Sequence, residues 1–252
     1  MTQLAAQTAL VTGANRGLGR EFVNQLLARG ATKVYAGARN PETIDINDPR
    51  VVPLQLDVTD PDSVARAAEV AGDVSVVVNN AGISLAARVL DDDTAKLRRE
   101  LEVNLFGPLA VTSAFPDQLA ARSGVVVNVA SILAWIALGG SYSVSKAALG
   151  SATDSMRLEL GPWGVQVVGF YMGYVDTDMA SGVEAPKSAP ADVVRQVLDG
   201  IQAGALEVTA DDMTRAVRDG LAQPVDERYA PFLPEAAEAH DQEHHTTTGE
   251  PS

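Results

Sequence analysis

A tyrosine and a lysine that could exchange protons lie four positions apart in Tyr142-Ser143-Val144-Ser145-Lys146. On a helix, residues four apart share a face, so the lysine ammonium would lie beside the phenol. A free phenol titrates near pH ~10, and a neighbouring positive charge lowers that pKa. Tyr142 could then pass a proton to and from an alcohol or carbonyl oxygen. Many ordinary helices carry this spacing, so its meaning depends on the elements that position the pair.

A glycine-rich stretch that could hold a phosphate follows the first predicted strand. Residues 7–12 form a short apolar run that predicts a buried strand, and residues 20–30 predict a helix with one apolar face. Between them, Gly13, Gly17 and Gly19 have the spacing G-x-x-x-G-x-G. Glycines permit a tight turn and let the backbone approach a pyrophosphate at a helix N-terminus. Strand, glycine loop and helix in this order open a dinucleotide-binding βαβ unit.

Strands alternate with helices along the rest of the chain. Further strands are predicted at residues 33–39, 50–56, 74–78, 124–130, 165–170 and 206–209. Helices are predicted at residues 61–71, 94–119, 141–160 and 191–203, with Pro108 and Pro116 bending or interrupting the second. Because the strands are apolar on both faces, we expect an α/β fold with a doubly wound parallel sheet of the Rossmann type. We expect one domain over residues 1–234 and a polar, disordered tail over residues 235–252.

The composition excludes several classes of function. The chain has no cysteine, which excludes disulfides and thiolate chemistry, and the adjacent His244 and His245 are poorly arranged to share a metal ion. We therefore predict no metal site. The net charge of −14 argues against nucleic acid and membranes as partners. Without a signal peptide or an apolar run of ~20 residues, we expect a cytoplasmic protein.

Six short motifs, in order along the chain, resemble those of the short-chain dehydrogenase/reductase family. They are Thr12-Gly13-Ala14-Asn15-Arg16-Gly17-Leu18-Gly19, Asn79-Asn80-Ala81-Gly82, Asn104 in the next helix, Ser131 after the fifth strand, the Tyr142/Lys146 pair, and Val175-Asp176-Thr177. The resemblance covers about residues 7 to 220. It implies an enzyme, an oxidoreductase that moves a hydride between a nicotinamide cofactor and a carbonyl or secondary alcohol.

The resemblance also implies a role for each matching residue. Tyr142 would be the general acid in reduction and the general base in oxidation, and Lys146 would lower its pKa and bind the nicotinamide ribose. Ser131 would hold the substrate oxygen near Tyr142, and Asn104 would position a water that links Lys146 to solvent. The other expected cofactor contacts are Gly13, Asn15, Arg16, Gly17, Leu18, Gly19, Arg39, Asp57, Val58, Asn80, Ala81, Gly82, Gly173, Val175 and Thr177.

Two stretches depart from the family pattern. Ser131 precedes Tyr142 by 11 positions, fewer than in most of the family, so Gly139-Gly140 must turn tightly. Ser141 and Ser143 are the alternative hydroxyls should Ser131 not reach the substrate oxygen. Met172-Gly173 stands where the family usually has Pro-Gly, which predicts a looser backbone beside the nicotinamide and an altered cofactor affinity.

The choice of nicotinamide depends on the end of the second predicted strand. NAD-binding proteins of this type place an acidic residue there for the ribose 2′-hydroxyl, whereas this chain has Gly37-Ala38 followed by Arg39. Arg39, together with Arg16 in the glycine loop, suits a 2′-phosphate. We therefore expect NADP (NADPH), with NAD as the less favoured cofactor.

Two other functions are alternatives to an active oxidoreductase. One is a non-catalytic, NADP-binding regulatory protein of the same fold. The other is an extended sugar-nucleotide epimerase, which is disfavoured because those enzymes have T-G-x-x-G-x-x-G spacing and a larger C-terminal domain. The substrate is a small molecule whose identity the sequence does not determine. Apolar residues in the loops suggest an apolar compound: Leu133, Trp135, Ile136, Leu138, Tyr174 and Met179.

The helices predicted at residues 94–119 and 141–160 carry more small and apolar residues than one buried face requires. A helix that is apolar around most of its circumference is normally buried on more than one side. The sheet would cover one side, and a symmetric partner could cover the other. Members of the resembling family commonly pair through these two helices, so we expect a homodimer or homotetramer.

Overall fold

A computed structural model describes residues 4–91 and 93–233, so the tail predicted from residue 235 lies outside the described residues. The chain forms two compact units, residues 1–218 and residues 219–252. The described part of the second unit contains the short helix α9 (Val225–Tyr229), which follows Pro224. The sheet and the candidate site lie in the first unit.

Seven strands form one sheet in the order β3-β2-β1-β4-β5-β6-β7, and each neighbouring pair is parallel. The strands are β1 (Thr8–Thr12), β2 (Lys33–Ala38), β3 (Val51–Gln55), β4 (Val76–Asn79), β5 (Val125–Val129), β6 (Gln166–Tyr171) and β7 (Glu207–Thr209). All seven predicted strands are therefore confirmed. Along β1, Val11 belongs to one hydrophobic core and Leu10 to the other, because successive side chains of a strand point to opposite faces.

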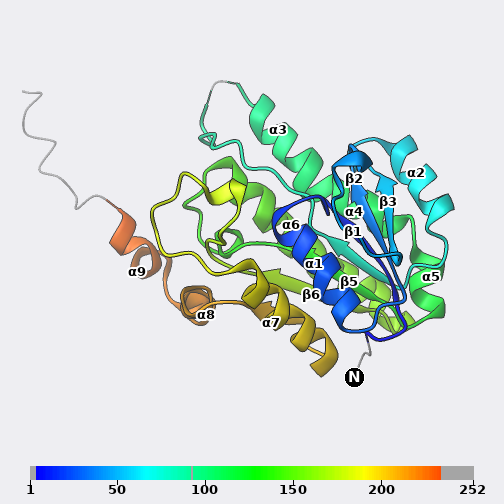
Figure 1. Cartoon of the computed structure of the whole chain (residues 1–252). Coiled ribbons are helices and arrows are strands. Elements are labelled where there is room, and N and C mark those ends of the chain that lie inside the picture. The colour runs from blue at the N-terminus through cyan, green and yellow to red at the C-terminus, as the bar shows by residue number, and fades with distance from the viewer. Residues whose placement is uncertain (1–3, 92, 234–252) are drawn as a thin grey trace, which may run out of the picture. The chain divides into compact units, whose positions relative to one another are not determined.

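Helices cover both faces of this sheet (Figure 1). On one face, α1 (Gly17–Ala28) packs beside α7 (Pro190–Ala203), and both bury apolar side chains in the first core. On the other, α2 (Pro61–Val70), α4 (Gly107–Ser113), α5 (Pro116–Ala121) and α6 (Ser141–Leu160) contribute to the second core. The predicted doubly wound α/β fold is confirmed. Burial of these apolar side chains is the main favourable contribution to folding.

The helix predicted at residues 94–119 is interrupted near Pro108 and Pro116, as expected, but a π-helical turn that was not predicted precedes Pro108. The chain forms α3 (Ala95–Leu101), then a π-helical turn at Glu102–Phe106, and then α4 and α5. Pro116 lies in the first turn of α5, where no intrahelical bond needs its missing N–H, whereas Pro108 lies just after the π-helical turn. The π-turn places Asn104 in its middle and buries it completely. Such turns occur often at functional sites.

The helix α8 (Asp212–Asp219) was not predicted. The side chain of Asp211 holds its first turn, because Oδ1 accepts hydrogen bonds from the N–H of Thr214 at 2.8 Å and from its hydroxyl at 2.9 Å. An aspartate before the first turn of a helix is a common N-terminal signal. The signal was therefore present, but the helix is short and mostly polar.

The order of the strands decides where a ligand can bind. β1 lies between β2 and β4, so the chain leaves β1 in one direction across the sheet and later returns to its other side. In open α/β sheets, ligands bind beyond the carboxyl ends of the strands at such a switch point. The glycine loop follows β1 and the Asn79–Gly82 turn follows β4, so both lie there.

Candidate active site

The glycine loop is joined to the turn after β4 by side-chain hydrogen bonds. Asn80 Nδ2 donates to the carbonyl oxygens of Thr12 at 2.9 Å and Gly13 at 3.1 Å. In return, Thr12 Oγ1 accepts from the N–H groups of Asn80 at 3.0 Å and Ala81 at 2.9 Å. A Cβ on Gly19 would lie 2.1 Å from the Gly13 oxygen, so only glycine fits there. This close approach forms a turn whose backbone could contact a pyrophosphate.

The other end of the glycine loop lies against the segment after β6. A Cβ on Gly17, whose φ is +51°, would lie 3.3 Å from Cγ2 of Thr177. The Thr177 hydroxyl donates to the Val175 carbonyl at 3.3 Å, and Val175 is buried in the first core. Leu18 packs against the same core, and Asn15 is half-buried in the loop. The structure therefore brings two of the six motifs together at the start of α1.

Asn104 is fixed at both ends of its side chain. Its Oδ1 accepts from the Ile83 N–H, while its Nδ2 donates to the Ile83 oxygen and to Oγ of Ser145, each at 2.9 Å. A Cβ on Gly82 would lie 3.3 Å from Asn104 Oδ1 and 3.7 Å from Lys146 Nζ. Asn104 and Lys146 therefore both approach the same point beside Gly82.

The charges around Tyr142 differ from the prediction. Lys146 Nζ lies 5.7 Å from the centroid of the Tyr142 ring and donates to the Val129 oxygen at 2.7 Å. Burial lowers the pKa of Lys146 to about 8. Burial raises the pKa of Tyr142 well above its usual value, the charge of Glu100 raises it further, and a side-chain hydrogen bond with Ser131 opposes both. The predicted lowering of the Tyr142 pKa is therefore wrong for this structure, because burial and the charge of Glu100 raise it.

Ser131 follows β5, and its side chain hydrogen-bonds the Tyr142 hydroxyl. This bond opposes the rise in the pKa of the phenol. Ser131 is buried, and its Oγ also accepts from the Leu133 N–H at 3.1 Å at the start of the 3₁₀ turn Ile132–Ala134. Of the alternative hydroxyls, Ser143 Oγ accepts from the Gly139 N–H at 2.9 Å. Ser141 Oγ is buried without a hydrogen-bond partner among the described residues.

The short segment before Tyr142 turns at Gly140, as predicted. Gly140 has a φ of +56°, and a Cβ there would lie 2.2 Å from the Ala87 oxygen. The next N–H, that of Ser141, donates to this same oxygen at 2.9 Å and begins α6. A side chain at position 140 would both strain the backbone and separate these groups. Gly140 thus lets the chain reach Tyr142 with fewer residues.

Hydrogen bonds hold the backbone where the family usually has proline. The Met172 oxygen accepts from the Ile132 N–H at 2.9 Å, and the buried Met172 side chain joins the first core. The Gly173 N–H donates to Asp211 Oδ2 at 2.8 Å. The looser backbone predicted from Met172 therefore has a compensating restraint. Asp211 was missed because it lies 38 positions away in the sequence.

Two arginines act on the carboxylate of Asp57, one of the expected cofactor contacts. Burial raises the pKa of Asp57, but hydrogen bonds from Thr59 and the charges of Arg39 and Arg99 outweigh it, and the net shift is downward. Arg39 is exposed just beyond β2, while Val58 is buried in the second core. Arg99, on α3, was not predicted to belong to this region. No sequence motif marks it, because α3 meets the end of β3 only in the folded chain.

Arg16 is engaged by a partner that the sequence did not reveal. Its Nη1 lies 2.9 Å from Oδ2 of Asp178, which begins the 3₁₀ turn Asp178–Ala180. The two side chains are 71% and 73% exposed, so solvent screens this pair strongly. A stronger anion could therefore replace Asp178 as the partner of Arg16.

Several apolar side chains are exposed near these groups, on the loops after β4, β5 and β6. Leu85, Leu138, Tyr174 and Met179 all expose a large part of their surface. Trp135 differs, because its ring stacks on Tyr171 with centroids 4.0 Å apart. The carboxyl edge of the sheet thus carries an apolar lining beside the polar groups.

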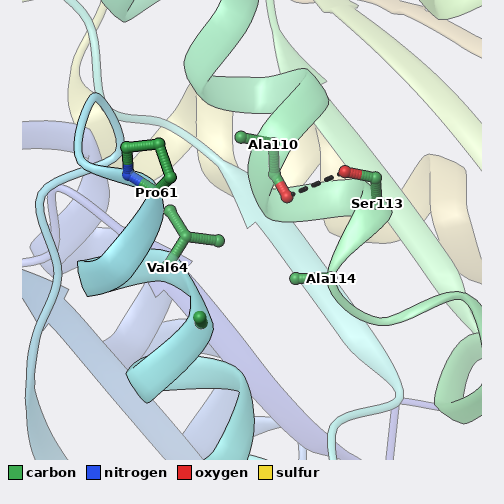
Figure 2. Close-up of a pocket in the computed structure, with 6 residues that line it drawn as sticks. Pro61, Val64, Ala110, Ser113 and Ala114 are labelled. Atoms are coloured by element: carbon green, nitrogen blue, oxygen red, sulfur yellow. Dashed lines mark hydrogen bonds between the residues drawn. The ribbon is translucent and has the colours of Figure 1, made fainter.

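A shallow hollow lies away from these residues, between α2 and α4 (Figure 2). It is lined by Pro61, Val64, Ala65, Ala110, Ser113 and Ala114. Its single side-chain hydroxyl, Ser113 Oγ, donates to the Ala110 oxygen at 3.1 Å. No titratable residue lines it, so we assign it no chemistry. Within residues 4–91 and 93–233, no cluster of His, Asp and Glu could hold a metal ion, and no helix is long and apolar enough to cross a membrane.

Comparisons with known proteins give a consistent picture. The sequence model of short chain dehydrogenase matches residues 7–188. The short-chain dehydrogenase srdE of Neurospora crassa is 33% identical over 187 residues, which is 71% of this chain and 64% of that protein. The NADPH-dependent 1-acyldihydroxyacetone phosphate reductase of Schizosaccharomyces pombe is 33% identical over 186 residues, 70% of this chain and 62% of that protein. This chain therefore matches less than two thirds of the length of either relative.

A solved structure, a short chain dehydrogenase from Burkholderia cenocepacia in complex with NADP, is 41% identical with a TM-score of 0.89. The match covers 93% of this chain and 100% of that one. The match to the family's sequence model extends from β1 to the segment beyond Thr177 and so includes all six motifs. The chain belongs to the short-chain dehydrogenase family.

Proposed function

We propose that this protein is an NADP-dependent oxidoreductase that transfers a hydride between the nicotinamide and a carbonyl or secondary alcohol. The observation that carries the proposal is the meeting of Asn104, Ser131, Tyr142 and Lys146 at the carboxyl edge of the sheet. Ser131 hydrogen-bonds Tyr142, the Lys146 ammonium lies 5.7 Å from the Tyr142 ring centroid, and Asn104 and Lys146 both lie beside Gly82.

The residues present fit a dinucleotide. The backbone approach between Gly13 and Gly19 at the start of α1 suits a pyrophosphate, and the Lys146 ammonium would donate to ribose hydroxyls. When bound, the nicotinamide supplies the hydride chemistry. In reduction, the Tyr142 hydroxyl gives its proton to the substrate oxygen, which Ser131 holds by a hydrogen bond. The Lys146 ammonium then stabilises the phenolate that remains.

The pKa directions favour Tyr142 as an acid. Because burial raises the pKa of Tyr142, the phenol keeps its proton at neutral pH until a carbonyl oxygen can accept it. Lys146, with a pKa of about 8, is mostly charged under the same conditions. We therefore propose that Tyr142 enters carbonyl reduction in its protonated form.

Three arginines support NADP. Arg39 and Arg99 both act on the Asp57 carboxylate, and Arg16 lies in the glycine loop with an exposed, exchangeable partner. A guanidinium suits a phosphate because it can donate two parallel hydrogen bonds. The names of the Schizosaccharomyces pombe relative and of the Burkholderia cenocepacia structure point the same way.

The exposed apolar residues support an apolar carbonyl compound as substrate. Leu85, Leu138, Tyr174 and Met179 come from three loops at the edge of the sheet that carries the polar groups. Exposed apolar patches rimmed by polar residues commonly mark binding sites. The stacked Trp135 would form a fixed wall rather than a mobile contact.

We further propose that the protein is a homodimer or homotetramer in the cytoplasm. On the outer side of α6, Val144 and Leu158 expose apolar surface, and Phe106 of the π-turn does the same. A second copy could cover these residues through a symmetric interface.

The test is NADPH oxidation by the purified protein with a panel of apolar ketones and aldehydes. Turnover in the wild type, its loss in Tyr142→Phe, and weaker activity with NADH are expected. NADPH binding in a direct titration without turnover of any carbonyl would instead favour a non-catalytic, NADP-binding regulatory protein.

A further inference from the structure

A buried glutamate lies beside the site without a charged partner. Glu100, on α3, is 0% exposed, and its Oε1 accepts a 2.6 Å hydrogen bond from the Leu85 N–H. Its Oε2 has no hydrogen-bond partner among the described residues, and no ion pair there includes Glu100. A buried carboxylate without a cation is unfavourable, so its presence at a site calls for a role.

The position of Glu100 connects three parts of the site. It precedes Asn104 by about one helical turn, at the end of α3 where the π-turn begins. Through Leu85 it holds the loop after β4, whose apolar side chains face the proposed substrate. Two residues further, the Ala87 oxygen of this loop accepts from the Ser141 N–H, immediately before Tyr142. The loop after β4 is thus hydrogen-bonded to α3 through Glu100 and to the start of α6 through Ala87.

Glu100 also acts on the proton donor directly. Among the charged and hydroxyl groups that face Tyr142, Lys146 comes from the same helix, Ser131 from the segment after β5, and Glu100 from α3. After burial, Glu100 is the largest influence on the pKa of Tyr142, and it raises that pKa. A negative charge beside a phenol makes loss of its proton less favourable.

We infer that Glu100 is a positioning residue for the proposed reaction, which fixes the wall of the substrate pocket through Leu85 and places a negative charge that retains the Tyr142 proton for donation. This inference rests on the proposed function. It adds a reason for the protonation state of Tyr142, because a neighbouring negative charge makes loss of the phenol proton less favourable. Neither the glycine motif nor the Tyr142/Lys146 spacing indicates Glu100.

The sign of the effect follows from the charge. Glu100→Gln removes the negative charge and should lower the pKa of Tyr142. In reduction the protonated phenol is the active form, so the rate falls as pH rises through this pKa. In oxidation the phenolate is active, so the rate rises through the same pKa. In the variant, both the fall in the reduction rate and the rise in the oxidation rate should therefore occur at lower pH.

Two variants separate the charge from the hydrogen bond. Glu100→Gln keeps an oxygen that can accept from the Leu85 N–H, whereas Glu100→Leu removes both charge and acceptor. For both variants, we expect the pH at which kcat changes with Tyr142 ionisation to fall by at least about half a pH unit. Only Glu100→Leu should also raise KM for an apolar ketone. Glu69→Gln, an exposed change on α2 with the same effect on net charge, is the control.

An unshifted pH profile in both Glu100 variants would overturn the inference while leaving the proposed function intact. Should the wild type reduce no carbonyl, the proposed function fails, and the phenol can be titrated without turnover. The signal is then the tyrosinate absorbance that Tyr142→Phe lacks, followed over the alkaline range in which circular dichroism shows folded protein. Glu100→Gln should ionise at lower pH than the wild type, and equal titration would refute the inference. Both variants remove the charge, so the test needs only one of them to have the same melting temperature as the wild type.

Discussion

The Arg16 guanidinium and the Asp178 carboxylate form a 2.9 Å ion pair that joins the glycine loop to the turn after β6. Both side chains are largely exposed, and exposed pairs of this kind are worth about 0–1 kcal/mol. Such a pair holds Arg16 near the start of α1 but yields readily to a phosphate. Asp178 is thus a competitor for the group expected to bind NADP.

Removing this competitor should strengthen NADPH binding. Asp178→Asn leaves Arg16 without its carboxylate, so we expect the Kd for NADPH to fall by about two- to fivefold, the equivalent of up to ~1 kcal/mol. The Kd for NADH should not change, because NADH lacks the 2′-phosphate. Fluorescence titration measures both constants. Asp192→Asn, which removes one carboxylate partner of the exposed Arg195, is the control. An equal gain for NADH would show that Arg16 does not contact the phosphate.

Reversing the charge at the end of β2 should alter the choice of cofactor. Arg39→Asp replaces a cation with a carboxylate that repels a phosphate and can accept from a ribose hydroxyl. A charge-assisted hydrogen bond is worth roughly 1.5–3 kcal/mol, so NADPH should lose at least about tenfold in kcat/KM relative to NADH. Arg122→Asp, an exposed change before β5, controls for net charge. A wild type that already prefers NADH would refute the arginine argument.

Removal of the hydroxyl group tests the role of Tyr142 as the proton donor. Tyr142→Phe keeps the ring beside Lys146 and removes the hydroxyl, so the transferable proton is lost. We expect kcat to fall at least ~100-fold, the scale of general acid–base catalysis. NADPH should still bind and the melting temperature should change little. Near-normal turnover would exclude Tyr142 as the acid.

Lys146 is expected to lower stability while supporting catalysis. Its pKa is about 8 in the fold against 10.5 in the ordinary side chain. The unfolded chain therefore binds more protons between these two values, and the stability of the fold rises with pH across this window. Lys146→Met should raise the free energy of unfolding at pH 7 by up to about 3 kcal/mol, less the lost hydrogen bond to Val129.

Urea unfolding at pH 7 and pH 10 measures this effect, and the advantage of Lys146→Met should shrink at the higher pH. Carbonyl reduction should be lost at both. Lys96→Met, at an exposed position of α3, is the control and should change neither property. A variant that is less stable than the wild type at pH 7 would show that the bond to Val129 outweighs the burial of the ammonium.

The proposed assembly can be tested on the outer face of α6. Leu158 is 79% exposed near the end of this helix, where a second copy of the chain could cover it. Leu158→Glu should convert a dimer or tetramer to smaller species in light scattering. Val70→Glu, an exposed apolar position of α2, is the matched control. A wild type with the mass of a single 26.4 kDa chain at micromolar concentration would refute the proposal.

Local patterns were enough to predict the fold and the tight turns that glycines form. The apolar runs predicted each strand of the sheet, because a strand buried on both faces must be apolar at successive positions. The need for glycine at position 140 was also predicted, since a short connection to Tyr142 allows only a tight turn. The π-turn around Asn104 was not, because no composition distinguishes it from a regular helical turn.

The tertiary structure decided the properties that depend on distant neighbours. Spacing placed Lys146 beside Tyr142, but only the depth of burial and the approach of Glu100 determine that the phenol pKa rises. Asp178 pairs with Arg16 across 162 positions, and Asp211 reaches Gly173 across 38. A sequence fixes which side chains share a helix face or follow a strand, since these depend on local geometry. Desolvation and charge at a site depend on every element packed around it, and those elements meet only when the chain folds.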